Sequence, residues 1–399
     1  MNALRAGLLV ALLAAFAAGP APAGAATATR GIDYDLDGSP PPSPPALNRL
    51  DLYQPAGATP GDRRPIVVYV HGGGWRKGDK RNAIADKVDL FTGAGYLFAS
   101  VNYRLSPNPI DPAFPPGRVR FPAHPDDVGE AVGWIDRNVA DWGGDPTRII
   151  LVGHSAGAQI IALLATDRRY VGRWGVDRRQ IVAAVPLDGG YDVTRTAMTG
   201  SPRMRMLFYN AFATPAENAV DDAWARASPV RFAGPDDPAM LAVTQAAQSP
   251  RIAASAALVD ALGGAPSELL AVPYDHGAIN RAVGSADDPA GETDAIMTFI
   301  DRALAAARPP RTVITAHPPR RVELRRHQRR ARVRFRFAAR GEARAFECRL
   351  NDRSFRRCSS PQRYRLRRGR HRFRVRAIGA DGARGPAEGF RFRVVGHRR

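Results

Sequence analysis

The stretch Arg148 to Gly157 reads RIILVGHSAG and joins an apolar run to a tight, glycine-flanked turn. Ile149 to Val152 consists of β-branched residues and leucine, which predicts a buried parallel strand. The apolar segment 158–166 after the turn predicts a helix. In this context GHSAG is typical of a nucleophile elbow, because its two glycines lack the Cβ atoms that would clash where strand and helix cross. Ser155 is therefore the candidate nucleophile.

Predicted strands and helices alternate on both sides of this stretch. The strands are expected at 48–53, 65–70, 96–103, 149–152, 181–187, 240–244 and 267–273. The helices are expected at 80–92, 126–142, 158–166, 252–262 and 294–307. Such alternation predicts an α/β domain with a doubly wound, mostly parallel sheet.

Two segments break the alternation. The proline-rich segment 106–125 predicts an irregular loop. The segment 192–235 has no clear alternation and contains several aromatic residues, and we interpret it as a mostly helical insertion that forms part of a lid. Packing of these aromatics at the surface is the alternative.

A second glycine-rich motif, HGGGW at His71 to Trp75, follows the predicted strand 65–70. HGGGW and GHSAG, in this order and at this separation, resemble the α/β-hydrolase fold. The closer resemblance is to the HGGG-bearing serine esterases, a group that includes hormone-sensitive-lipase-like, feruloyl and acetyl-xylan esterases and arylformamidases. It covers residues 48–307. It implies cleavage of carboxylic esters through an acyl-enzyme on Ser155, without a metal or an organic cofactor.

The same resemblance implies which groups bind the oxyanion. Attack on an ester carbonyl places negative charge on its oxygen, and backbone N–H groups aimed at that point stabilise the charge. In relatives the donors are the second and third glycines of HGGG and the residue after the nucleophile, which here are Gly73, Gly74 and Ala156. His71 is then expected to support the loop by hydrogen bonding and not to act as the base.

Elimination among the eight histidines leaves His276 as the candidate base. Four of the others lie in the arginine-rich C-terminal part, and His71 lies in the glycine loop. His154 is expected to point away from Ser155, and His124 precedes a proline in the irregular loop. His276 follows the last predicted strand, within DHGAIN, where family members carry the catalytic histidine. A surface histidine without a catalytic part is the alternative.

The third member of a Ser-His-acid triad departs from the family pattern. Relatives place an aspartate in the loop after the seventh strand, but here residues 245–250 read QAAQSP and contain no carboxylate. We predict Asp188, at the end of the neighbouring strand, because pancreatic-type lipases draw their acid from that strand end. The alternatives are a turn-capping role for Asp188 and orientation of His276 by Gln248, Ser249 or Asp275.

Two other functions stay open beside the esterase. The missing carboxylate favours a non-catalytic, surface-binding protein, whereas the complete HGGG loop with Ser155 and His276 argues against such decay. An amide or N-formyl hydrolase would use the same site, since amides and esters pass through the same kind of oxyanion.

The N-terminus has the organisation of a secretory signal peptide over residues 1–25. A short basic start precedes the apolar segment 6–18, and AGA before Ala26 is a small-x-small cleavage site. The apolar part is too short for a stable anchor, and no second run of about 20 apolar residues predicts a transmembrane helix. We therefore expect an extracellular or cell-surface-associated bacterial protein. The proline-rich segment 26–47 predicts an extended spacer before a catalytic domain over 48–308.

The C-terminal part, residues 311–399, is strongly basic. It holds 29 arginines, no lysine and six acidic residues, so that it accounts for the formal net charge of +20 of the whole chain. Apolar residues and arginine alternate in 332–337 and 371–377, which predicts amphipathic strands of a small β-sandwich. Cys348 and Cys358, ten residues apart in an exported chain, predict a local disulfide and not a metal site. The pattern resembles a bacterial immunoglobulin-like or fibronectin-III-like repeat, in which two cysteines bridge a hairpin.

The arginine-rich strand faces imply a basic surface with anionic partners. An anionic cell-wall polymer, a polysaccharide or lipid head groups suit such a surface. Nucleic acid is not expected as a partner. The phenylalanines that alternate with arginine are better explained as the core of the sandwich than as platforms for stacked bases. They are Phe335, Phe337, Phe373 and Phe392. The alternative is that the module is a spacer without a binding function, and that arginine is simply the cationic residue that its surface uses.

Overall fold

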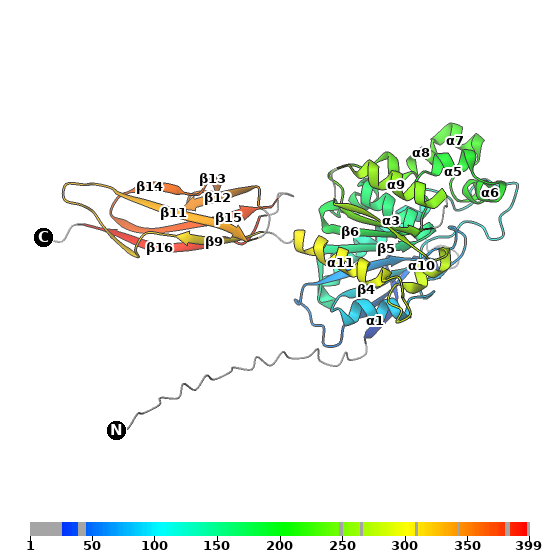
Figure 1. Cartoon of the computed structure of the whole chain (residues 1–399), viewed down its shortest axis with the longest axis horizontal. Helices are drawn as coiled ribbons and strands as arrows, with labels where there is room; N and C mark the ends of the chain where they lie inside the picture. The colour runs from blue at the N-terminus through cyan, green and yellow to red at the C-terminus, as the bar shows by residue number, and fades with distance from the viewer. Residues whose placement is uncertain are drawn as a thin grey trace, which may run out of the picture.

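Two bodies of secondary structure follow each other along the chain, an α/β domain up to residue 307 and an all-β module from residue 310 (Figure 1). The computed structural model describes residues 26–38, 45–246, 250–263, 266–307, 310–340, 343–379 and 384–396. The predicted signal peptide over residues 1–25 lies outside these ranges. Within the ranges, no helix combines the length and the apolar character needed to cross a membrane.

An eight-stranded sheet forms the centre of the α/β domain, in the order β1-β2-β4-β3-β5-β6-β7-β8. Its strands are β1 (Thr27–Asp33), β2 (Arg49–Gln54), β3 (Arg64–Val70), β4 (Leu97–Val101), β5 (Gly144–His154), β6 (Ile181–Leu187), β7 (Ala239–Gln245) and β8 (Ser267–Val272). The pairs β1–β2 and β2–β4 are antiparallel, and the pairs from β4 to β8 are parallel. The predicted mostly parallel sheet is confirmed.

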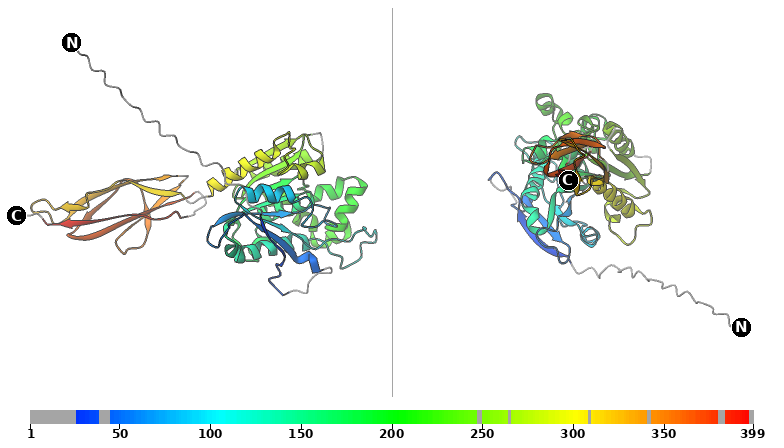
Figure 2. Two further views of the ribbon diagram at one scale, coloured as in Figure 1. Left: turned by 90° about the horizontal axis from the view of Figure 1, so that it is seen from below. Right: turned by 90° about the vertical axis from the view of Figure 1, so that its left-hand side faces the viewer.

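Helices cover both faces of this sheet (Figures 1 and 2). One face carries α2 (Ala123–Asn138), α3 (Ala156–Thr166) and α9 (Pro250–Leu262), and the other carries α1 (Ala85–Gly93), α10 (His276–Ala282) and α11 (Glu292–Ala306). The connections hold α4 (Arg169–Gly172), η1 (Pro45–Asn48), η2 (Val139–Trp142), η3 (Arg178–Gln180) and η4 (Pro229–Arg231). Leu151 of β5 belongs to the first core and Ile150 to the second. The central strands are apolar at nearly every position because both of their faces are buried.

Strand β1 corrects the predicted spacer over residues 26–47. Thr27–Asp33 pairs with β2 at the edge of the sheet, and the following Tyr34 is fully buried, with its hydroxyl donating to the Asn102 carbonyl at 2.8 Å. The side chains of β1 are exposed or half-buried, so that the strand carries no apolar alternation by which to recognise it. The α/β domain therefore begins near residue 27 instead of residue 48. Residues 39–44 of the proline cluster lie outside the described residues.

The segment between β6 and β7 is helical, as predicted, and contains α5 (Val193–Thr199), α6 (Pro202–Ala211), α7 (Pro215–Asp221) and α8 (Ala223–Arg226). These helices gather at one end of the sheet, beyond the carboxyl ends of the parallel strands (Figure 1). Phe208 and Phe212 are buried and pack edge-on against Trp75 of the HGGGW motif. Phe208 and Phe212 thus pack against the glycine loop, whereas Tyr209 and Trp224 stack on each other within the insertion.

The C-terminal module is a two-sheet sandwich with strand orders β10-β16-β15-β12-β13 and β14-β11-β9. Its strands are β9 (Arg311–Ala316), β10 (Arg321–Glu323), β11 (Ala331–Arg340), β12 (Ala345–Leu350), β13 (Arg356–Cys358), β14 (Gln362–Leu366), β15 (Gly369–Ile378) and β16 (Glu388–Val395). Phe335 and Phe373 stack between the sheets, with ring centroids 4.0 Å apart. The predicted disulfide is confirmed, since Cys348 and Cys358 are bonded and join β12 to β13.

Candidate active site

The GHSAG turn places Ser155 between the end of β5 and the first residue of α3. Its backbone has φ 56° and ψ −112°, a conformation that non-glycine residues rarely adopt. A Cβ atom on Gly153 would lie 2.6 Å from the Gly157 carbonyl oxygen, and one on Gly157 would lie 2.1 Å from the Val70 carbonyl oxygen. Only glycine therefore fits at either position, and the crowded turn holds the serine hydroxyl half-exposed above the sheet.

The structure brings Ser155, His276 and Asp188 together, although their strands are separated along the chain. The Ser155 hydroxyl lies 3.0 Å from Nε2 of His276, and Nδ1–H of the same ring donates to Oδ2 of Asp188 at 2.5 Å. His276 is the first residue of α10 and its side chain is 37% exposed, whereas Asp188 is fully buried. A serine, an imidazole and a buried carboxylate in this order form the arrangement that activates a serine nucleophile.

Asp188 is held as a buried carboxylate by the strand next to it. It accepts hydrogen bonds from the Thr244 hydroxyl at 3.1 Å and from the Gln245 amide at 2.8 Å, and Nε of Arg251 lies 3.5 Å from its Oδ2. Burial on its own raises the pKa of Asp188. The hydrogen bond from His276, the charge of Arg251 and the Gln245 bond outweigh this effect and lower the pKa to about 2. Asp188 is therefore ionised at neutral pH.

The other candidates for orienting His276 have different positions. Asp275 caps the N-terminus of α10, where its side chain accepts from the N–H groups of Gly277 and Ala278. Asp192, four residues after Asp188, caps α5, where its side chain accepts from Arg195 N–H. Gln248 and Ser249 lie outside the described residues.

The residues that surround Asp188 were not predicted from the sequence. Gln245 is the last residue of β7, and Arg251 lies in the first turn of α9. The polar residues in the sequence from Gln245 onward could have indicated them, because a buried carboxylate at the end of the neighbouring strand needs hydrogen-bond donors beside it.

His154 contacts His276, which the sequence did not predict. Its Nε2–H donates to the backbone carbonyl of His276 at 2.7 Å, and the two ring centroids are 4.6 Å apart. Burial first, and then the neighbouring His276, lower the pKa of His154 to about 4. A neutral His154 thus supports the start of α10 without adding a charge beside the imidazole.

The HGGGW loop lies against the nucleophile. Gly73 and Gly74 have φ values of 116° and 62°, which favour glycine, and a Cβ atom on Gly73 would lie 1.8 Å from the Lys77 carbonyl oxygen. A Cβ atom on Gly72 would lie 3.1 Å from that of Ser155. Ala156 is the first residue of α3, and the N–H groups of a first helical turn have no helical acceptor.

His71 supports this loop through its ring and its backbone carbonyl. The ring is buried, stacks on Tyr103 with centroids 4.6 Å apart, and donates from Nδ1 to the Gly72 carbonyl at 2.7 Å. The Tyr103 hydroxyl donates to the His71 carbonyl at 3.0 Å. Burial lowers the pKa of His71, so that it is a neutral structural group.

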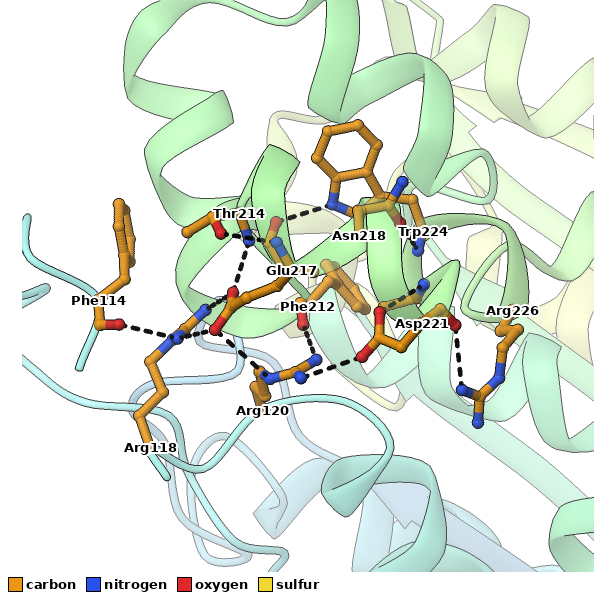
Figure 3. Close-up of polar contacts among 12 residues, drawn as sticks. Phe114, Arg118, Arg120, Phe212, Thr214, Glu217, Asn218, Asp221, Trp224 and Arg226 are labelled. Carbon is orange, nitrogen blue, oxygen red and sulfur yellow. Dashed lines mark hydrogen bonds and ion pairs between the residues drawn. The ribbon is translucent and has the colours of Figure 1, made fainter. Parts of the chain in front are cut away.

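Two arginines of the segment 106–122 tie it to the helical insertion (Figure 3). Arg118 is 1% exposed and donates to both carboxylate oxygens of Glu217 at 2.7 Å, and Arg120 pairs with Asp221 at 3.0 Å. Hydrogen bonding from Arg118 lowers the pKa of Glu217 to about 2. The loop and α7 therefore form one ion-paired unit, which we call the lid clamp (Arg118, Arg120, Glu217 and Asp221).

Several curated proteins that match the chain are named esterases. Esterase LipQ from Mycobacterium tuberculosis is 34% identical over 150 residues, which is 37% of this chain and 33% of LipQ. Carboxylesterase NlhH from the same species is 40% identical over 113 residues, 28% of this chain and 32% of NlhH. The chain thus spans about a third of the length of these relatives.

Solved structures support the fold. A truncated carbohydrate esterase from gut microbiota superimposes with a TM-score of 0.55 at 20% identity, covering 72% of this chain and 99% of that one. The BD-FAE family model matches residues 50–262, which is more than half of the chain and includes both glycine motifs. The protein therefore belongs to the BD-FAE family of α/β-hydrolase esterases.

Proposed function

We propose that the protein is an exported serine esterase that cleaves carboxylic esters through an acyl-enzyme on Ser155. The observation that carries the proposal is the hydrogen-bonded chain from Ser155 through His276 to Asp188, with contacts of 3.0 and 2.5 Å. Membership of the family and the names of the matched relatives support the same chemistry.

In the acylation step, the Ser155 oxygen attacks the ester carbonyl carbon while Nε2 of His276 takes the hydroxyl proton. The carbonyl oxygen gains a negative charge, which the N–H groups of Gly73, Gly74 and Ala156 stabilise. The carbon–oxygen bond to the alcohol then breaks, and His276 returns its proton to the leaving alkoxide. In the second step water attacks the acyl-enzyme by the same route and frees the carboxylic acid.

Asp188 acts through His276. Its carboxylate accepts Nδ1–H, which keeps Nε2 free to take the serine proton, and its charge stabilises the imidazolium that forms. The low pKa of about 2 keeps this charge in place at neutral pH. An acid on the end of β6 thus replaces the one that relatives carry after β7.

The substrate is an ester on a small molecule or on a polysaccharide. The 37% exposure of the His276 side chain supports a site that an ester carried on a larger molecule can reach. Leu207 of α6 limits the room above the oxyanion loop, since a Cβ atom on Gly74 would lie 3.1 Å from its side chain. We infer that this part of the site favours short acyl groups.

Export is proposed from the signal-peptide pattern over residues 1–25. The disulfide between Cys348 and Cys358 supports it, because disulfides persist in oxidising compartments and are rare in the cytosol. The protein is then expected outside the cell or at its surface.

The test is hydrolysis of p-nitrophenyl acetate and butyrate by the mature protein, with an N-formyl substrate in parallel. We expect ester turnover, its abolition in Ser155→Ala, and labelling by a fluorophosphonate that is lost in the same variant. A preference for the N-formyl substrate would favour the amidase. An absence of both turnover and labelling would favour the non-catalytic surface protein.

A further inference from the structure

One outer face of the C-terminal module concentrates arginines that form no ion pair with the described acidic residues. Six arginines on the neighbouring strands β12, β15 and β16 point away from the core, and we call them the arginine face: Arg349, Arg370, Arg372, Arg374, Arg391 and Arg393. Within the described part of the module, the acidic side chains that form ion pairs, Glu323 and Glu347, pair with other arginines.

The strand register sets these arginines directly opposite one another. Arg374 faces Arg349 across the β12–β15 pair. On the other side of β15, Arg372 faces Arg391 and Arg370 faces Arg393. Like charges directly opposite on a sheet destabilise it, so that this arrangement disfavours the isolated module and favours a bound anion. Desolvation first, and then the neighbouring charges of Arg374 and Arg391, lower the pKa of the exposed Arg372.

Two buried atoms of this face lack a hydrogen-bond partner. Nε of Arg349 and Nε of Arg374 are both enclosed and neither finds an acceptor among the described residues. A buried guanidinium N–H without an acceptor costs free energy. Both unpaired donors belong to one cross-strand pair, and an oxyanion that sits between the two side chains would satisfy them together.

Two adjoining hollows open onto the same face. One of about 310 Å³ is lined by Arg320, Arg372, Arg374 and Arg391 with no carboxylate among its lining residues. The second, of about 540 Å³, shares three of these arginines, adds Arg370 and Arg393, and has Asp352 as its one carboxylate. Gly389 stands opposite Arg374 in the register, where any other residue would present a side chain over the first hollow. Two neighbouring arginine-lined hollows suit successive anionic groups of one chain.

We propose that the arginine face binds a linear polymer that carries repeated carboxylate or phosphodiester groups on a sugar or polyol backbone. Arginine presents a planar fork of donors that matches both oxyanions, which a lysine ammonium does not, and this module contains no lysine. The binding is independent of the ester chemistry at Ser155.

The same face disfavours two other classes of partner. The phenylalanines of β15 and β16, Phe373, Phe390 and Phe392, are turned into the core and buried. The half-buried Phe355 is covered by the guanidinium groups of Arg349 and Arg376, so that the described rings of this face offer no free platform for stacked bases. The large apolar side chains that are exposed in the described residues, Met198, Val220 and Leu269, all lie in the α/β domain and not in the module. The described part of the module therefore offers no large apolar side chain to insert into a lipid bilayer.

The position of the module fits a role in attachment. It lies beyond the C-terminal end of α11, and helices α5 to α8 lie at the opposite end of the α/β domain (Figures 1 and 2). A polymer held by the arginine face therefore lies on the side of the α/β domain opposite helices α5 to α8.

The opposite face of the sandwich supplies a matched control. There, Arg332 and Arg334 of β11 face Arg365 and Arg363 of β14, and all four are exposed. The arginine-face variant replaces four arginines of this face by glutamine: Arg370→Gln, Arg372→Gln, Arg391→Gln and Arg393→Gln. The control variant removes the same charge from the opposite face: Arg332→Gln, Arg334→Gln, Arg363→Gln and Arg365→Gln. Both full-length variants are expected to hydrolyse a soluble ester as the wild type does.

The experiment measures dissociation constants of the mature protein for polygalacturonate, for poly(glycerol phosphate), for neutral dextran and for duplex DNA at about 0.15 M salt. We expect binding to one or both anionic polymers, no binding to dextran, at least tenfold weaker binding by the arginine-face variant, and less than a threefold change in the control. The preferred polymer identifies the oxyanion. Equal losses in the two variants, no binding of either polymer, or tighter binding of DNA would overturn the proposal.

A second measurement needs no variant. Phenylglyoxal modifies accessible arginines, and mass spectrometry of the wild-type protein with and without the polymer locates those that are protected. Protection of Arg370, Arg372, Arg391 and Arg393, but not of Arg332 and Arg334, is the expected result. Protection spread evenly over both faces would contradict a defined binding face.

Discussion

Asp188 directly follows β6 and accepts a hydrogen bond at 2.5 Å from Nδ1 of His276, which follows β8. The strand between them, β7, contributes Gln245 as a second donor to the same carboxylate. The acid therefore reaches the histidine across β7, whose own loop has no carboxylate between residues 245 and 250. The contact assigns Asp188 the role of orienting His276, and substitution of Asp188 tests that role.

Replacing Asp188 by asparagine should lower kcat by about 10³- to 10⁴-fold, because an amide no longer fixes the His276 tautomer that takes the serine proton. The measurement is steady-state hydrolysis of p-nitrophenyl butyrate. Asp192→Asn is the matched control, since asparagine caps a helix as well as aspartate does and Asp192 only caps α5. Activity of Asp188→Asn within tenfold of the wild type would remove Asp188 from the mechanism.

The elbow was the part of the site that the sequence predicted best. Its strand, glycines and helix are contiguous, and local sterics dictate the turn, as the 2.1 Å approach of a Gly157 Cβ atom to Val70 illustrates. The alternation of strands and helices likewise predicted the sheet, because strands that are buried on both faces are apolar throughout.

The remaining parts depend on contacts between distant segments. Strand β1 is stabilised by pairing at an exposed edge and has no apolar alternation. Helix α2 begins at Ala123, inside the segment expected to be a loop, because tertiary packing buries His124 and Pro125 there. The contact of His154 with His276 forms only when β5 and α10 come together in the fold, so that no local sequence pattern predicts it.

Gly73→Ala should reduce kcat/KM by about 10²-fold or more, since the new Cβ atom would lie 1.8 Å from the Lys77 carbonyl and would displace a proposed oxyanion donor. Gly93→Ala in α1 is the control, because nothing lies within 4 Å of its Cβ position. Equal activity of the two variants would show that the loop has no part in stabilising the oxyanion.

The stability of the α/β domain should depend on Asp188 in a defined pH window. Folding lowers the pKa of Asp188 from the ordinary value of about 3.9 to about 2. Its carboxylate therefore stabilises the folded state by about 2 kcal/mol above pH 4, and this contribution is lost as the pH falls through about 2. Urea unfolding of the wild type and of Asp188→Asn at pH 7 and near pH 2 measures it. A difference between the two proteins that stays constant over this range would contradict the expectation.

Reducing the Cys348–Cys358 disulfide should destabilise only the C-terminal module, by about 3 kcal/mol for a loop of ten residues. All five tryptophans precede residue 307, so that their fluorescence reports the α/β domain alone. We expect Cys358→Ser to leave the tryptophan-monitored transition and ester hydrolysis unchanged, while far-ultraviolet circular dichroism registers earlier melting of the sandwich. A parallel shift of the tryptophan transition would mean that the two parts unfold together.

The lid clamp should couple the stability of the insertion to substrate binding. Glu217→Gln leaves the Arg118 guanidinium buried beside a neutral amide, which should destabilise the α/β domain by about 2 kcal/mol. This loss is smaller than for a fully enclosed ion pair, because the Glu217 side chain is 27% exposed. Since the clamp does not touch His276, KM should rise several-fold while kcat changes less.

Glu268→Gln provides the comparison for this variant. It breaks an ion pair with Arg302 in which the two side chains are 46% and 59% exposed, and exposed pairs contribute less than about 1 kcal/mol. Tryptophan fluorescence in urea suits both variants, because Trp224 donates its indole N–H to the Ala213 carbonyl beside the clamp. If Glu217→Gln behaved like Glu268→Gln in stability and in KM, the insertion would be held by its aromatic contacts with Trp75 and not by the charges of the clamp.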